Sequence, residues 1–236
     1  MINLKEYIKE GLFDDVDKLE GKNGLTNNLK FLKKEITDWI INNTSERVYK
    51  NKLSVDMTTT PPIVDYDGGI NMSKSITSLN NDGMFQWGEV KGNFNCSYCK
   101  SLESLEGCPK KVGKNFWCCG CDALKSLKGG PEKVGNLYDC AYCKSLKSLE
   151  GSPKEVENTF YCRGCKSLKT LKGAPKDVGG RFECSWCSEL KDLKYAPENV
   201  GAGFHCNDCG TQFTEEDVKK VSNVKGKIHT FETIGV

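Results

Sequence analysis

Several features are missing from this sequence of 236 residues, and each absence excludes a class of protein. It contains no apolar run of about eighteen residues, so no segment is expected to span a membrane. Residues 1–10 mix charges and lack an apolar h-region, so we expect no secretory signal and a cytoplasmic location. Lys and Arg total 34 against 32 for Asp and Glu, and the formal charge of +2 argues against a dedicated nucleic-acid binder.

Signatures of catalysis are missing as well. The chain has two histidines, His205 and His229, and no Walker, Rossmann, HExxH or GxSxG pattern. An active site needs a base, a nucleophile or a metal gathered in a concave site, and the sequence does not obviously bring the two histidines together. We therefore expect a protein that is not an enzyme and has no small-molecule substrate.

Cysteine, in contrast, is abundant, with fourteen residues, and twelve of them recur with a period of 22. An aromatic residue lies two positions before the first cysteine of each repeat, and a valine lies four positions before that aromatic. Two leucines and a proline follow, so the unit is V-x3-Φ-x-C-x2-C-x2-L-x2-L-x3-P, where Φ is aromatic. The first series is Cys96, Cys118, Cys140, Cys162, Cys184 and Cys206, and the second is Cys99, Cys121, Cys143, Cys165, Cys187 and Cys209.

A fixed period of about 20 to 50 residues predicts a solenoid, a propeller or an array. A 22-residue unit is too short for a propeller blade and suits one strand, one turn and an extended return. Strand alternation places Phe94 and Cys96 on one face, and the Gly-Pro segments after the leucines predict turns without helix. We therefore expect a mainly β fold, a parallel-strand solenoid whose turns stack valine, aromatic, cysteine and leucine into one core.

The unit resembles the leucine-rich repeat, whose pattern is L-x2-L-x-L-x2-N/C-x-L. Phe94 takes the place of the second leucine, Cys96 that of the third, and Cys99 that of the N/C position. The match has two departures, because Leu102 comes one residue late and Val90 lies one residue early.

Two further motifs narrow the resemblance. Lys100-Ser-Leu-Glu-Ser-Leu-Glu-Gly107 and Pro109-Lys-Lys-Val-Gly113 recur with variation to Gly201. With them the chain resembles the leucine-rich-repeat-like arrays encoded by tailed bacteriophages of gut bacteria, in which the second cysteine position is often Asn. The resemblance covers roughly residues 70–230. It implies a solenoid and an intracellular phage protein in the bacterial host cytoplasm, and hardly any biochemistry.

Both ends of the array depart from the repeat, as caps on a solenoid do. An offset of 24 aligns residues 70–72 with 94–96, so residues 70–93 predict a capping repeat without cysteine before the cysteine repeats of 94–209. Residues 210–236 predict a C-terminal cap in which Thr214 opens a helix to about Val221. A strand follows, in which Val224, Ile228 and Thr230 repeat Val200, Phe204 and Cys206.

The N-terminal part has a different pattern. Residues 1–45 predict a short helix over about 4–10 and a longer one from a Thr26 cap to about Ile41. Residues 46–69 predict a linker with one or two short strands. We favour packing of the helices on the first turn over a docking segment for a larger assembly. The apolar face of the longer helix is Leu29, Leu32, Ile36, Trp39 and Ile40.

The cysteines allow three interpretations. Cys96-x2-Cys99-x18-Cys118-x2-Cys121 matches the spacing of a four-cysteine zinc site. We favour two stacked columns of buried thiols, because each cysteine falls at an inward or N/C position and all turns are equivalent, whereas zinc would pair them. Disulfide or redox chemistry is the least favoured. No cofactor is therefore expected, with structural zinc as the alternative, and the remaining Cys108 and Cys119 are expected to be incidental small or surface residues.

Outward positions of the repeat carry aromatic and cationic residues of the types that dominate binding interfaces. We expect them to form one face that binds a protein, and the alternative is that they are scattered surface aromatics that stack on each other. The candidate residues are Tyr98, Trp117, Tyr142, Tyr161, Arg163, Trp186 and His205. A lysine column is expected to be a solvated face rather than a phosphate-binding groove, namely Lys125, Lys147, Lys169 and Lys191.

These patterns lead to one favoured function and two alternatives. The favoured one is a non-enzymatic protein-interaction solenoid of a phage, which binds a host or viral protein. The first alternative is a structural or packaged virion component docked by its N-terminal helices. The second is a zinc-stabilised nucleic-acid-binding module.

Overall fold

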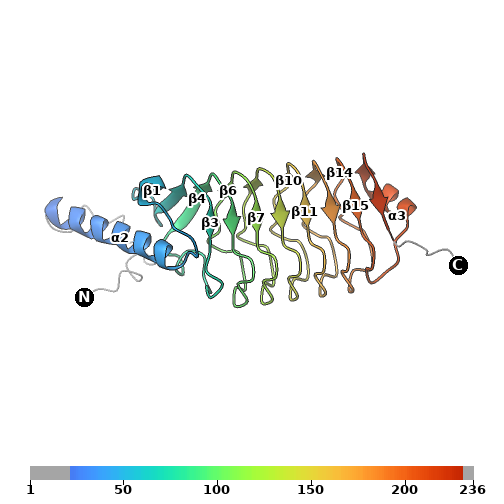
Figure 1. Ribbon diagram of the computed structural model, residues 1–236, viewed down its shortest axis with the longest axis horizontal. Helices are drawn as coiled ribbons and strands as arrows, with labels where there is room; N and C mark the ends of the chain where they lie inside the picture. The colour runs from blue at the N-terminus through green and yellow to red at the C-terminus, as the bar shows by residue number, and fades with distance from the viewer. Residues whose placement is uncertain (1–21, 231–236) are drawn as a thin grey trace.

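The computed structural model describes residues 22–230, with side chains from residue 29 onward. The chain is mainly β and winds into an elongated parallel-strand solenoid with a helix at each end (Figure 1). The predicted fold class is therefore confirmed. Each 22-residue unit forms two short strands, where the sequence had predicted one strand and an extended return, because the valine segment pairs as regularly as the aromatic segment does.

The strands form two sheets along the solenoid. The nine-stranded sheet has the order β1 (Leu53–Asp56), β2 (Ile63–Tyr66), β4 (Gln86–Val90), β6 (Lys111–Val112), β8 (Lys133–Val134), β10 (Glu155–Val156), β12 (Asp177–Val178), β14 (Asn199–Val200) and β16 (Asn223–Val224). The eight-stranded sheet has the order β17 (Ile228–His229), β15 (Phe204–His205), β13 (Phe182–Glu183), β11 (Phe160–Tyr161), β9 (Tyr138–Asp139), β7 (Phe116–Trp117), β5 (Phe94–Asn95) and β3 (Ile70–Asn71).

The 22-residue period is the register of both sheets. Val112 pairs with Val134, and Phe94 pairs with Phe116, so equivalent residues of successive turns lie side by side. The inward aromatics form a continuous column, the aromatic ladder, with neighbouring ring centroids 5.0 to 6.0 Å apart. Its members are all fully buried, namely Phe94, Phe116, Tyr138, Phe160, Phe182 and Phe204.

The turn after the leucines requires a left-handed backbone. Four successive turns place glycine there, including Gly129, with φ of 80°. A Cβ on Gly129 would lie 2.5 Å from the Cα of Glu106, so a side chain is excluded by space as well as by φ. The last repeat replaces this glycine with Tyr195, whose φ is 67° and whose ring is half exposed.

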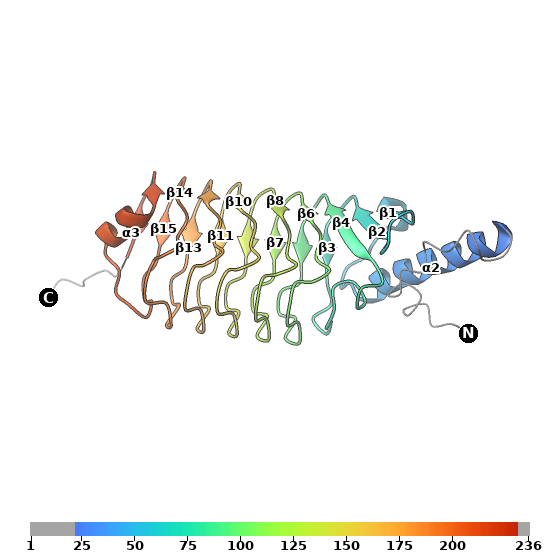
Figure 2. The same ribbon diagram turned by 180° about the vertical axis from the view of Figure 1, so that it is seen from behind.

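The N-terminal helix α2 (Lys22–Asn42) packs on the first turn, as we favoured. Leu32, Ile36 and Ile40 are buried, and the Trp39 ring meets Phe85 edge-on at 5.5 Å. Helix α2 extends outward from the N-terminal end of the solenoid (Figure 2).

The start of α2 was placed incorrectly from the sequence. The helix begins at Lys22, so Thr26 lies inside it and is not its cap. Thr and Gly cost at most about 1 kcal/mol in a helix interior, which does not stop a helix that can continue. The short helix expected over residues 4–10 lies outside the described residues.

Residues 46–69 belong to the solenoid rather than linking to it. A single turn of 3-10 helix, η2 (Lys50–Lys52), precedes β1, and β1 and β2 form an antiparallel hairpin. Strand β2 then pairs in parallel with β4, so the hairpin extends the nine-stranded sheet at its N-terminal end. The predicted short strands are present.

The C-terminal cap follows the prediction. Helix α3 (Glu215–Val221) begins after Thr214, whose hydroxyl accepts from the Asp217 amide in a capping box. Val200 pairs with Val224 and Phe204 with Ile228, at the offset of 24.

Over the described part of the chain, no helix has the length and apolarity needed to cross a membrane.

Candidate interaction face

The outward residues of the eight-stranded sheet form one column, which we call the strand column. Each follows an aromatic-ladder residue, and strand alternation therefore points it away from the core. Neighbours pair in register, for example Trp117 with Asp139 and Tyr161 with Glu183. Glu183 is buried and the other five are half-buried. The column is Asn95, Trp117, Asp139, Tyr161, Glu183 and His205.

A second row lies three residues further along each turn, and we call it the turn row. All its members have φ between 53° and 68°, the left-handed region that L-residues rarely adopt. The amide of Tyr98 donates to the Cys119 carbonyl of the next turn, so the sheet hydrogen bonding continues through this bend. The turn row is Tyr98, Gly120, Tyr142, Gly164, Trp186 and Asp208.

Large rings alternate with small residues along the turn row for a steric reason. A Cβ on Gly120 would lie 2.6 Å from the Tyr98 ring, and a Cβ on Gly164 would overlap the Tyr142 ring. Each tyrosine ring therefore lies across the glycine of the following turn. The Trp186 indole Nε1 instead donates to an Asp208 carboxylate oxygen at 3.0 Å. The rings remain accessible, with Tyr98 53%, Tyr142 45% and Trp186 45% exposed.

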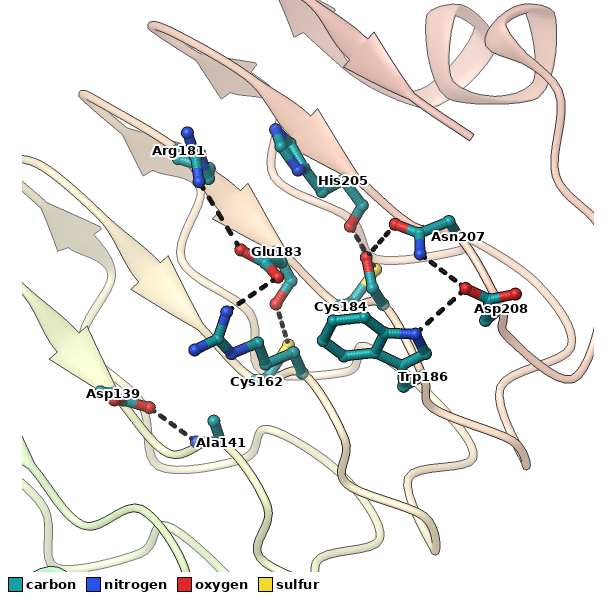
Figure 3. A network of polar contacts seen from close by, with 12 residues as sticks. Asp139, Ala141, Cys162, Arg181, Glu183, Cys184, Trp186, His205, Asn207 and Asp208 are labelled. Carbon is teal, nitrogen blue, oxygen red and sulfur yellow. Dashed lines mark hydrogen bonds and ion pairs between the residues drawn. The ribbon is translucent and has the colours of Figure 1, made fainter. Parts of the chain in front are cut away.

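Charged residues in and beside the two rows are paired with each other. The Arg163 guanidinium lies 3.4 Å from a Glu183 carboxylate oxygen. Arg181 approaches the same carboxylate at 3.9 Å (Figure 3). Arg163 also lies over the rings of Tyr142 and Tyr161, at 5.7 and 5.2 Å from their centroids. This arginine therefore connects the turn row to the strand column through cation–π contacts.

The N-terminal end of the face is hollowed. A shallow hollow of about 700 Å³ lies between Tyr98 and Trp117, with Lys74, Cys119 and Asp139 also lining it. Burial raises the pKa of the Asp139 carboxyl, although it accepts a hydrogen bond from the Ala141 amide. The hollow therefore combines two aromatic rings with few exposed charges.

The two histidines do meet, which corrects the sequence interpretation. His205 pairs in register with His229, and their ring centroids lie 4.2 Å apart. Burial lowers the pKa of His205, and the nearby charges of Arg181 and His229 lower it further. Burial and the neighbouring cations therefore disfavour the charged form of His205, and the two stacked rings close the strand column at this end.

The twelve periodic cysteines form two columns in the core. Second-series thiols donate to the carbonyl of a first-series cysteine on the preceding turn, as Cys143 does to Cys118 at 3.2 Å. Four first-series thiols reach a strand-column carbonyl on the following turn, as Cys140 does to Tyr161 at 3.3 Å. Those carbonyls already accept a backbone N–H, so the thiol is a second donor to them. A second-series thiol supplies a donor to a buried carbonyl in the volume of a small side chain.

Burial suppresses thiol chemistry at most of these cysteines, whereas hydrogen bonds with the neighbouring thiols of Cys121 and Cys184 lower the pKa of Cys99 and Cys209, the terminal members of the second series. Burial raises the pKa of Cys140 and Cys162 well above the ordinary range, and it raises the pKa of Cys187 to about 12. Cys119 is half-buried beside Ser97, and burial raises its pKa too. Thiolates are the reactive form, so the cysteines with a raised pKa are poor nucleophiles at neutral pH.

All fourteen cysteines are free thiols. Within residues 22–230 no three or more His, Cys, Asp or Glu side chains converge in a way that would hold a metal ion. Cys108 is buried at the position where other turns have glycine, serine or alanine. The geometry is that of two packed thiol columns.

The lysine column is partly neutralised by acidic residues on adjacent turns. Lys125 pairs with Glu103 at 2.8 Å, and Lys172 in a neighbouring column pairs with Glu150 at 2.8 Å. Both pairs are exposed, so each contributes little to stability. This pattern is typical of a solvated face.

The fold defines the class of this protein, a parallel-strand β-solenoid repeat protein with an aromatic outer face. Comparison of the chain with protein-family models, with curated proteins and with solved structures finds no match in any of the three. The candidate residues all lie on or beside the two rows. Their partners Glu183, Asp208 and Arg181 lie in or beside the same outward columns of the sequence pattern, but they were not among the predicted site residues.

Proposed function

We propose that this chain is a non-enzymatic protein-interaction solenoid that binds a protein partner through the turn row and the strand column. The observation that carries the proposal is the row of three exposed rings, Tyr98, Tyr142 and Trp186, on a backbone that is hydrogen-bonded to the next turn at each ring. Tyr, Trp and Arg dominate interface hot spots, and a row held in this way loses little conformational entropy on binding. The resemblance to phage repeat arrays favours a host or viral protein in the bacterial cytoplasm as partner.

The test is partner capture by a triple variant, Trp117→Ala, Tyr161→Ala and Trp186→Ala. A matched control replaces Tyr49 and Tyr195, which are 52% and 50% exposed outside the face. We expect the triple variant to stay folded by circular dichroism and to lose the partner that both the parent and the control retain. Equal capture by all three proteins would refute the proposal.

A second candidate function rests on α2. This helix leads away from the solenoid and exposes Phe31 to 56% of its surface, as a docking segment for a larger assembly would (Figure 1). A packaged virion component would use such a helix. Mass spectrometry of purified phage particles separates the two, because only a packaged component is present in them.

A further inference from the structure

The turn row has a repeat distance of its own. Strands stack about 4.8 Å apart, so a ring on every second turn recurs about every 9.6 Å, and Tyr98 and Trp186 lie about 19 Å apart. Tyr98 and Tyr142 lean on the next glycine in the same way, so their rings share one orientation. The turn row thus presents three aromatic rings at a regular spacing.

The charged groups beside the turn row are largely paired with each other. Lys74, Arg163 and Arg181 accompany the acids Asp139, Glu183 and Asp208, and two residues beyond the row Lys100 and Lys144 both approach Asp122, at 3.7 and 3.2 Å. The Glu183 carboxylate forms ion pairs with both arginines. The Trp186 indole donates a hydrogen bond to Asp208, and the Lys74 ammonium lies 5.6 Å from the Tyr98 ring centroid. Such a face offers neither a polyanion nor a polycation a complementary field, so it suits an uncharged, apolar ligand.

Among regular peptide conformations, one has a matching period. A polyproline II helix rises about 3.1 Å per residue with three residues per turn, so the same face recurs about every 9.3 Å. A β-strand presents the same face about every 6.7 Å. An α-helix presents it about every 5.4 Å, and two of its turns span about 10.8 Å. Over two ring intervals the mismatch is about 0.6 Å for polyproline II and about 2.4 Å for the α-helix.

We propose that the turn row binds an uncharged proline-rich segment in the polyproline II conformation, one helical turn to each of Tyr98, Tyr142 and Trp186. Proline rings pack on exposed aromatic rings, and the preformed helix loses little entropy on docking. This inference rests on the proposed function, because the segment would belong to the protein partner.

The test is a titration of the full chain with synthetic decaproline, followed by calorimetry and by tryptophan fluorescence. The decisive variant is Tyr142→Gly, which removes the middle ring. Glycine already occupies this left-handed position in two other turns, so the backbone is preserved. The matched control is Tyr195→Gly, which also replaces a half-exposed tyrosine at positive φ with the glycine of the other repeats, away from the turn row.

We expect decaproline to bind the parent and the Tyr195→Gly control alike, and to bind Tyr142→Gly about tenfold more weakly, with circular dichroism showing that each variant is folded at the titration temperature. A ten-residue Gly-Ser peptide should not bind. No binding of decaproline at millimolar concentration overturns the inference, as does equal binding by Tyr142→Gly. Binding of a neutral oligosaccharide such as cellohexaose in place of decaproline also overturns it. In these cases loss of partner capture by the triple variant would still support the proposed function.

Discussion

Tyr138 is the one tyrosine in the aromatic ladder, and its hydroxyl is the basis of our sharpest stability prediction. The ring is fully buried and stacks between Phe116 and Phe160, with both centroid distances 5.0 Å. Within the described residues the hydroxyl has no hydrogen-bond partner. Burial raises the pKa of Tyr138 well above its ordinary value, as expected for a hydroxyl surrounded by core.

The change is Tyr138→Phe, which keeps the ring and removes the unpartnered oxygen. A buried polar group without a partner costs about 1–3 kcal/mol, and the small void left behind offsets part of the gain. We therefore expect the free energy of unfolding to rise by about 1 kcal/mol and the melting temperature by about 2–4 °C for a chain of this size. Urea and thermal unfolding followed by circular dichroism measure both.

The matched control is the reverse change, Phe160→Tyr, which adds a hydroxyl one turn along the ladder. It should lower the free energy of unfolding by about 1–3 kcal/mol. If Tyr138→Phe instead destabilises the protein by more than about 1 kcal/mol, its hydroxyl is hydrogen-bonded in solution and the reasoning is refuted.

Three further outcomes are expected. Cys187→Ala removes the thiol that donates to the Cys162 carbonyl at 3.3 Å. It should lower the free energy of unfolding by about 1–3 kcal/mol, as measured by urea titration. An unchanged urea midpoint would show that this hydrogen bond is dispensable. Burial raises the folded pKa of Cys187 to about 12, so its contribution to the free energy of unfolding is fully present below the unfolded pKa of about 8.5 and is lost as pH rises towards 12. The urea midpoint of the parent should therefore fall between about pH 8.5 and 12, and it should fall less in Cys187→Ala. Gly164→Ala places a Cβ against the Tyr142 ring at positive φ and should destabilise more than Gly83→Ala, which has positive φ and open space around it; equal melting temperatures would contradict the steric account of the alternating row.

Much of the fold could be predicted from the sequence because the period itself is the register. Each 22-residue step places equivalent residues side by side, so the core columns and the caps follow from alignment of the repeats. The nine-stranded sheet was missed because its repeating apolar signal is a single valine per turn, such as Val112, which shows no alternation, whereas Phe94 and Cys96 alternate with an outward residue. Regular pairing with the neighbouring turns, which no single repeat reveals, makes each valine segment a strand.

The interaction face was predicted in outline and not in its contacts. The columns located its aromatic residues, but the left-handed backbone that tilts the Tyr98 ring across Gly120 is a property of the folded turn. His205 and His229 were thought not to converge, although the offset of 24 already assigned them equivalent positions. Ion pairs around Glu183 depend on rotamers, which the sequence pattern does not encode.

The central claim is that the turn row contacts the partner. It is tested most directly by a photo-crosslinking amino acid placed at position 186 in one protein and at position 195 in a second, each produced in the cells that naturally make this chain. The account predicts a crosslinked partner from position 186 and none from position 195. A partner crosslinked from position 195 and not from 186 would contradict it.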